Sequence, residues 1–169
     1  MIIYYLDASA WIKRYYSETG TDWIESLFAG NPPLACASLG LIEVLATLAR
    51  KRKAQEIDTD QHTQKAMEVE QDWGQFIQIH LSSAVVERSI RVVKDYSLRG
   101  ADTIHLASAI ELREAIASSE NQVVIVTSDT ELVQGAQQGG FSVVNPEEED
   151  RQNSASSSSS EQSESGTSQ

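Results

Sequence analysis

The side chains with the spacing for chemistry are four carboxylates, which belong to Asp7, Glu43, Asp102 and Asp129. Two of them, Asp7 and Asp129, follow apolar runs at residues 2–6 and 123–127. A carboxylate at the carboxyl end of a buried strand lies at the mouth of an α/β sheet, where such folds bind ligands. Several carboxylates there repel one another unless a cation neutralises them, and oxygen-only ligands suit Mg²⁺ or Mn²⁺. The pattern predicts divalent-metal chemistry on a phosphodiester.

Strand-like and helical patterns alternate along the chain and would position these acids. Short runs rich in β-branched and aromatic residues predict strands at residues 2–6, 34–37, 76–80, 123–127 and 141–144. Apolar spacing of three and four predicts helices at 8–16, 21–28, 38–52, 59–75, 82–99, 101–116 and 129–137. Strands that alternate with helices predict an α/β fold whose parallel sheet is covered on both faces.

The composition changes sharply near Pro146. Residues 1–145 are long enough to bury the core of one domain, whereas residues 146–169 are acidic and rich in serine. Six acids and one base give this tail a charge of −5, which leaves −7 of the total −12 for the rest. Because the tail has little apolar surface to bury, we predict that it is disordered.

The acidic charge is a poor match for nucleic acid, because affinity for nucleic acid depends largely on neutralising phosphates. One concentrated basic patch favours nucleic-acid binding instead, and it consists of Arg50, Lys51, Arg52 and Lys53. Cys36 is the only cysteine, so no internal disulfide can form. The apolar runs are strand-sized, so we expect neither a signal peptide nor a membrane span and predict a cytoplasmic protein.

Four sequence motifs resemble those of PIN-domain nucleases, and their order and spacing are similar to those of VapC-type toxins of type II toxin–antitoxin pairs. The resemblance covers about residues 2–144 and leaves the tail outside. The motifs are Leu6-Asp7-Ala8-Ser9-Ala10, Ser38 with Ile42-Glu43, Arg99-Gly100-Ala101-Asp102-Thr103-Ile104-His105-Leu106-Ala107, and Val126-Thr127-Ser128-Asp129.

The resemblance implies a PIN-like three-layer α/β/α sandwich with a mostly parallel five-stranded sheet and metal-dependent endoribonuclease activity. Asp7 and Asp102 would be the main ligands of one or two Mg²⁺ or Mn²⁺ ions. Glu43 would bind metal or orient the attacking water, and Asp129 would complete the site. The resemblance also implies an RNA substrate, a homodimer and a small cognate antitoxin. Two alternatives remain: a PIN nuclease of RNA processing without an antitoxin, and a silent PIN module that binds RNA or protein.

Each acid also has a structural interpretation. Asp7 and Asp129 are placed to cap helices, and Asp102 stands near a helix start, where the helix dipole favours an acid. Glu43 lies among apolar residues in mid-helix, where a solvated acid is less natural. The hydroxyls of Ser9 and Thr127 would bond a carboxylate or a nearby backbone group.

The remaining polar and aromatic candidates have two interpretations each. The basic patch at residues 50–53 would bind the RNA backbone, or simply complement a helix C-terminus. Trp11, Tyr15 and Tyr16 would stack on bases or pack between helices. His105 would act as a base or pack with its ring satisfied, and we predict the packed histidine. Arg99 would meet phosphate or pair with a neighbouring acid.

Two other phosphate chemistries fit the sequence less well. A haloacid-dehalogenase-type phosphatase needs a second acid two positions after the first aspartate, where this chain has Ser9. A receiver domain needs a late lysine, and no lysine follows Lys94.

Overall fold

A computed structural model describes residues 1–117 and 120–161 of the chain. Within them, a five-stranded sheet has the order β3-β2-β1-β4-β5, and every neighbouring pair is parallel. The strands are β1 (Ile2–Leu6), β2 (Leu34–Ala37), β3 (Ile77–Ile79), β4 (Gln122–Val126) and β5 (Ser142–Val144). The predicted parallel five-stranded sheet is therefore confirmed. Compared with the predicted bounds, β3 is one residue shorter at each end, β4 begins and ends one residue earlier, and β5 begins one residue later.

The two central strands bring remote parts of the sequence to one edge of the sheet. β1 pairs with β4 from Ile2 opposite Gln122 to Leu6 opposite Val126. Both strands end at the same level, so the residues that follow them emerge together. Because the chain crosses from β1 to β2 on one side and reaches β4 on the other, this edge is a topological switch point, where open α/β sheets bind ligands.

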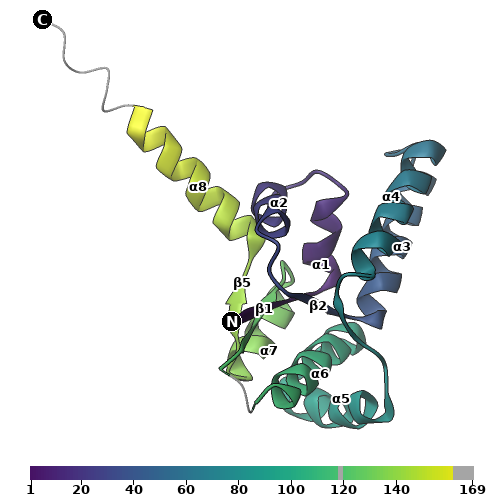
Figure 1. Ribbon diagram of the computed structural model, residues 1–169, viewed down its shortest axis with the longest axis vertical. Coiled ribbons are helices and arrows are strands. Elements are labelled where there is room, and N and C mark those ends of the chain that lie inside the picture. The colour runs from purple at the N-terminus through teal and green to yellow at the C-terminus, as the bar shows by residue number, and fades with distance from the viewer. Residues whose placement is uncertain (118–119, 162–169) are drawn as a thin grey trace, which may run out of the picture.

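Helices cover both faces of the sheet and make three layers (Figure 1). One apolar core packs the sheet against α5, α6 and α7, and a second core packs it against α1 to α4. The helices are α1 (Ala8–Trp11), followed by a 3₁₀ turn (Ile12–Arg14), α2 (Thr21–Ala29), α3 (Ser38–Lys53), α4 (Thr59–Trp73), α5 (Ser83–Tyr96), α6 (Gly100–Ala115) and α7 (Thr130–Gln138). None of the helices in the described ranges has both the length and the apolar character needed to cross a membrane.

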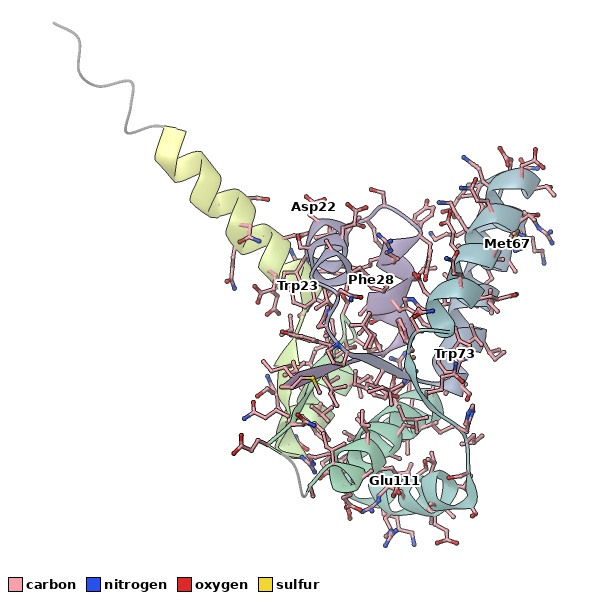
Figure 2. All side chains as sticks on the ribbon, viewed as in Figure 1. Asp22, Trp23, Phe28, Met67, Trp73 and Glu111 are labelled. Atoms are coloured by element: carbon pink, nitrogen blue, oxygen red, sulfur yellow. The ribbon has the colours of Figure 1, made fainter. Side chains whose placement is uncertain are left out.

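The region predicted to be a disordered tail begins with a helix instead, α8 (Pro146–Glu161). The structure therefore differs from the prediction over residues 146–161, and residues 162–169 lie outside the described residues. Helix α8 starts beside α2, next to Trp23 (Figure 2). The Asp150 carboxylate accepts the backbone N–H groups of Gly20 at 2.7 Å and Trp23 at 2.9 Å, so α8 caps the start of α2.

A buried lysine makes a second contact between α8 and the rest of the fold. The Lys13 side chain is 3% exposed and its Nζ lies 2.9 Å from Glu18 and 3.0 Å from Glu147. A buried ammonium needs such partners, because an unpaired charge away from water is costly. Polar contacts thus attach α8, which the amino-acid composition of the tail did not predict.

Candidate functional site

Asp7 lies immediately after β1 and is almost fully buried, with 4% of its surface exposed. Its carboxylate accepts the backbone N–H of Ala10 at 3.0 Å and so caps α1. It also accepts the hydroxyls of Ser9 and Thr127, each at 2.9 Å. Burial is the largest influence on the Asp7 carboxyl and raises its pKa, while His105 and these hydrogen bonds oppose the shift.

The two hydroxyls also fasten the loops on either side of the site. Ser9 Oγ accepts the backbone N–H of Ser128 at 2.9 Å, and Thr127 Oγ1 accepts the backbone N–H of Asp129 at 3.0 Å. The carboxylate and backbone bonds expected of these residues therefore occur together. The loop after β1 is tied to the loop after β4 through Asp7.

Asp102 and Asp129 meet across one arginine. Asp102 lies in the first turn of α6, and its Oδ2 accepts Arg99 Nε at 3.0 Å. Asp129 caps α7 by accepting the backbone N–H groups of Glu131 and Leu132 through Oδ1, and its Oδ2 binds Arg99 Nη2. The pKa of Asp102 is raised, first by burial and then by the charge of Asp129. Arg99 therefore bonds the acids rather than standing free for phosphate.

Glu43 projects from α3 and is held by a histidine from α6. Its Oε2 lies 2.8 Å from His105 Nε2, and His105 Nδ1 lies 3.0 Å from the Tyr5 hydroxyl. Because a carboxylate only accepts hydrogen bonds, we assign the proton to Nε2, which leaves Nδ1 to accept from Tyr5. His105 is 1% exposed, which agrees with the packed histidine that was predicted. Its bond to Glu43 was missed, because only the fold brings residues 43 and 105 together.

All four acids line one cavity of about 230 Å³, together with Ala8, Ser9, Arg99, Ala101 and His105. An adjoining cavity of about 550 Å³ shares Ala8, Ser9, Glu43 and Asp129 with it and reaches Lys13, Arg50 and Glu147. The four acids that the sequence singles out are thus assembled, and a groove leads from them along α3. Asp7 and Asp129 therefore cap helices and line the cavity at the same time.

The donor chemistry of the cavity fits a hard divalent cation, since the four acids offer only oxygen ligands. Burial raises the pKa of both Asp7 and Asp102, and the Asp129 charge raises the pKa of Asp102 further. A bound cation would therefore stabilise the ionised carboxylates of the site. As the side chains stand, no three His, Cys, Asp or Glu residues of the described ranges are arranged to hold a metal ion. The Arg99 guanidinium instead bonds Asp102 and Asp129.

Only one residue of the basic patch reaches the larger cavity, and it is Arg50. Lys51 is paired with Glu56 at 3.1 Å and its Nζ lies 3.4 Å from the centre of the Tyr16 ring. Lys51, Arg52 and Lys53 do not line this cavity. The predicted patch is therefore divided by the helix geometry, with Arg50 on the groove side.

The aromatic residues near the site are used mainly for packing. Trp11 and Tyr15 are buried, and the Trp11 indole N–H donates to the Tyr15 hydroxyl at 2.9 Å. The Tyr16 hydroxyl donates to Glu56 at 2.7 Å. Of the two interpretations given above, these contacts agree with packing.

Known proteins match this chain over most of its length. A family model described as PIN domain matches residues 4–137. The protein named Ribonuclease VapC45 of Mycobacterium tuberculosis (strain CDC 1551 / Oshkosh) is 28% identical over 143 residues, which cover 85% of this chain and 95% of that protein.

Solved structures share the fold at low sequence identity. The structure of VapBC2 from Rickettsia felis bound to a DNA fragment from its promoter gives a TM-score of 0.59 at 14% identity, covering 85% of this chain and 98% of that one. A toxin–antitoxin complex from Klebsiella pneumoniae gives 0.56 at 20% identity, covering 84% and 96%. The family match spans all four cavity acids, and the three-layer fold agrees with it: this chain belongs to the PIN domain family.

Proposed function

We propose that this protein is an endoribonuclease that hydrolyses RNA phosphodiester bonds with Mg²⁺ or Mn²⁺ and is the toxin of a type II toxin–antitoxin pair. The observation that carries the proposal is the meeting of Asp7, Glu43, Asp102 and Asp129 in one cavity at the switch point of the sheet. The relative named Ribonuclease VapC45 supports the same activity. We take residues 1–145 as the nuclease domain, with the acidic segment appended to it.

Asp7 and Asp102 would hold the ion, with Asp129 completing the site directly or through water. A bound divalent ion would lower the pKa of its water and so supply hydroxide near neutral pH. Ser9 and Thr127 fix the orientation of the Asp7 carboxylate through their hydroxyls. Each of these groups thus has a position before substrate arrives, which is how electrostatic catalysis avoids reorganisation.

Glu43 would orient the attacking water or accept its proton. The His105 Nε2–H group holds one carboxylate oxygen, Oε2, at 2.8 Å. The other oxygen has the freedom to face the cavity, and the Glu43 side chain is 32% exposed. Tyr5 in turn holds the histidine ring from the opposite side.

The larger cavity would receive the RNA strand, and Arg50 would bind one of its phosphates. Two basic side chains line this cavity, Lys13 and Arg50. Lys13 is neutralised by Glu18 and Glu147, whereas no ion pair of Arg50 is present among the described residues. Arg50 Nη2 donates to Thr47 Oγ1 at 2.7 Å, which keeps the guanidinium on the groove face of α3.

A substitution at Arg50 distinguishes RNA binding in the larger cavity from non-specific attraction by the basic charge of the helix. We expect Arg50→Gln to weaken RNA binding and to reduce the salt dependence of log K by about 0.7 per lost phosphate contact. Lys53→Gln removes the same charge three residues further along the helix, outside the cavity, and is the matched control. Fluorescence anisotropy with a labelled single-stranded RNA at several salt concentrations measures both. Equal losses in the two variants would place the RNA elsewhere.

Protein partners would include a small cognate antitoxin and a second copy of the chain. The neighbours in fold include VapBC2 and a toxin–antitoxin complex, which supports an antitoxin. An exposed apolar face supports a protein contact, and it carries Leu81, Val86, Ile90 and Val93 around a cavity of about 310 Å³. We propose that the protein acts in the cytoplasm.

The decisive experiment is cleavage of single-stranded RNA by the full chain with Mn²⁺ or Mg²⁺. We expect cleavage that stops with EDTA and falls at least about a hundredfold in Asp102→Asn, by analogy with the loss of one electrostatic contact at a transition state. Asp95→Asn is the control, since Asp95 is an exposed acid outside both cavities. Cleavage that persists in EDTA would contradict the metal mechanism. Absence of cleavage from any RNA, with metal binding retained, would favour a silent PIN module.

A further inference from the structure

Arg99 makes more contacts with the acidic site than any other basic residue that lines it. It stands at the N-cap position of α6 and lines the 230 Å³ cavity. Its Nε lies 3.0 Å from Asp102 Oδ2 and 3.3 Å from Glu131 Oε2, and its Nη2 bonds Asp129 Oδ2. One guanidinium therefore joins three carboxylates that belong to two different helices.

These contacts use the carboxylate oxygens that a metal ion would need. Asp129 Oδ1 accepts the backbone N–H groups of Glu131 and Leu132, and its Oδ2 accepts Arg99. Both oxygens of Asp129 are thus engaged. Asp102 likewise gives Oδ2 to Arg99. An ion that bound both residues would compete with the guanidinium for these oxygens.

The Arg99 side chain is able to leave. It is 64% exposed, in contrast to 10% for the Asp102 side chain that it bonds. Exposed ion pairs are weak, because water solvates the separated charges well. The contacts are therefore strong enough to neutralise the acids in the resting protein and weak enough to be replaced by a divalent cation.

We propose that Arg99 is a resident counter-cation of the acidic site, which competes with the divalent ion for Asp102 and Asp129 and sets its affinity. This inference rests on the proposed metal-dependent function. Arg99 is a positioning residue in this scheme: it keeps the carboxylates close together without metal and gives up their oxygens when metal binds. The metal affinity of the site is then lower than its four carboxylates alone would give.

Mn²⁺ titration of the full chain by isothermal calorimetry tests the proposal without any activity measurement. We expect Arg99→Gln to bind Mn²⁺ about tenfold more tightly, a difference of about 1.4 kcal/mol. Arg99→Lys keeps the charge but loses the guanidinium fork that joins two carboxylates. The Mn²⁺ affinity of Arg99→Lys should therefore lie between those of the wild type and Arg99→Gln. Arg88→Gln is the matched control, because Arg88 also bonds two carboxylates, those of Glu111 and Glu114, outside the cavity.

Thermal unfolding gives a second readout. In EDTA we expect Arg99→Gln to melt at a lower temperature than the wild type, because its acids lose their counter-cation. When Mn²⁺ is added, the melting temperature of Arg99→Gln should rise by more than that of the wild type. Equal or weaker Mn²⁺ binding by Arg99→Gln would overturn the proposal while leaving the metal site in place. Absence of Mn²⁺ binding by the wild type and by every variant would overturn both this inference and the metal dependence proposed above.

Discussion

Replacing Asp7 with asparagine should separate the stability of this protein from its activity. Asparagine caps a helix about as well as aspartate, so its side-chain oxygen can still accept the Ala10 N–H. The new amide would donate to Thr127 Oγ1, and the Thr127 hydroxyl would turn toward Ser9 Oγ, which lies 3.4 Å away. Every polar group of the network thus retains a partner, while the buried charge is removed.

The sign of the stability change follows from the pKa of Asp7. Burial raises it, so the folded protein holds the proton of Asp7 more tightly than the unfolded chain does. The neutral form is favoured by the fold, and the wild type loses this contribution as pH rises through the raised pKa. Asp7→Asn stays neutral, so we expect it to be about 1 kcal/mol more stable than the wild type at pH 7 without metal. This magnitude is typical of single stabilising substitutions.

Thermal unfolding in EDTA at pH 4 and at pH 7 measures this difference. We expect the variant to melt about 2–4 °C above the wild type at pH 7, and the gap to be smaller at pH 4, because the wild-type carboxyl gains its proton as the pH falls through its raised pKa. Added Mn²⁺ should stabilise the wild type but not the variant, and RNA cleavage by the variant should be lost. A variant that is less stable than the wild type in EDTA at pH 7 would refute the reasoning, because Asp7 would then be stabilised as an anion without metal.

Two further substitutions test parts of the fold that position the site. Asp150→Ala removes the carboxylate that α8 supplies to the start of α2, and we expect the free energy of unfolding in urea to fall by about 1–2 kcal/mol. Glu148→Ala, at an exposed position on the same helix, is the control and should change the stability little. Equal effects of the two substitutions would contradict the docking of α8. Gly40→Ala would place a Cβ 2.4 Å from Cys36 Sγ, so we expect a loss of about 1–3 kcal/mol by overpacking. Cys36→Ala in the same chain should recover much of that loss, and a double-mutant cycle with no coupling would refute the steric explanation.

The local elements were accessible from the sequence because strand and helix patterns are short-range. The β-branched run at residues 2–6 and the stretch at 123–127 have the composition of buried parallel strands, and both form such strands with minor shifts at their ends. Asp7 directly follows one predicted strand and Asp129 comes two residues after another, so the parallel topology alone was enough to bring both to one edge. Glu43 and Asp102 reach the same cavity from α3 and α6, and the packing of these helices on the sheet brings them there.

The helix over residues 146–161 was not expected from the sequence, because composition treats a segment in isolation. Residues 146–161 have little apolar surface, and by that measure they have no reason to order. In the structure α8 is attached by polar contacts, through Asp150 to the start of α2 and through Glu147 to the buried Lys13. Polar groups elsewhere in the fold, at the start of α2 and on Lys13, are the partners that the segment itself lacks.

The sequence by itself determined the strands, most of the helices and the four acidic positions, since these depend on neighbours along the chain. The tertiary structure decided which polar groups meet: Glu43 with His105, Arg99 with Asp129, and Arg50 rather than its three basic neighbours with the groove. Such pairings join residues far apart in sequence or on different faces of one helix. They depend on how the helices pack on the sheet, which no local pattern of residues specifies.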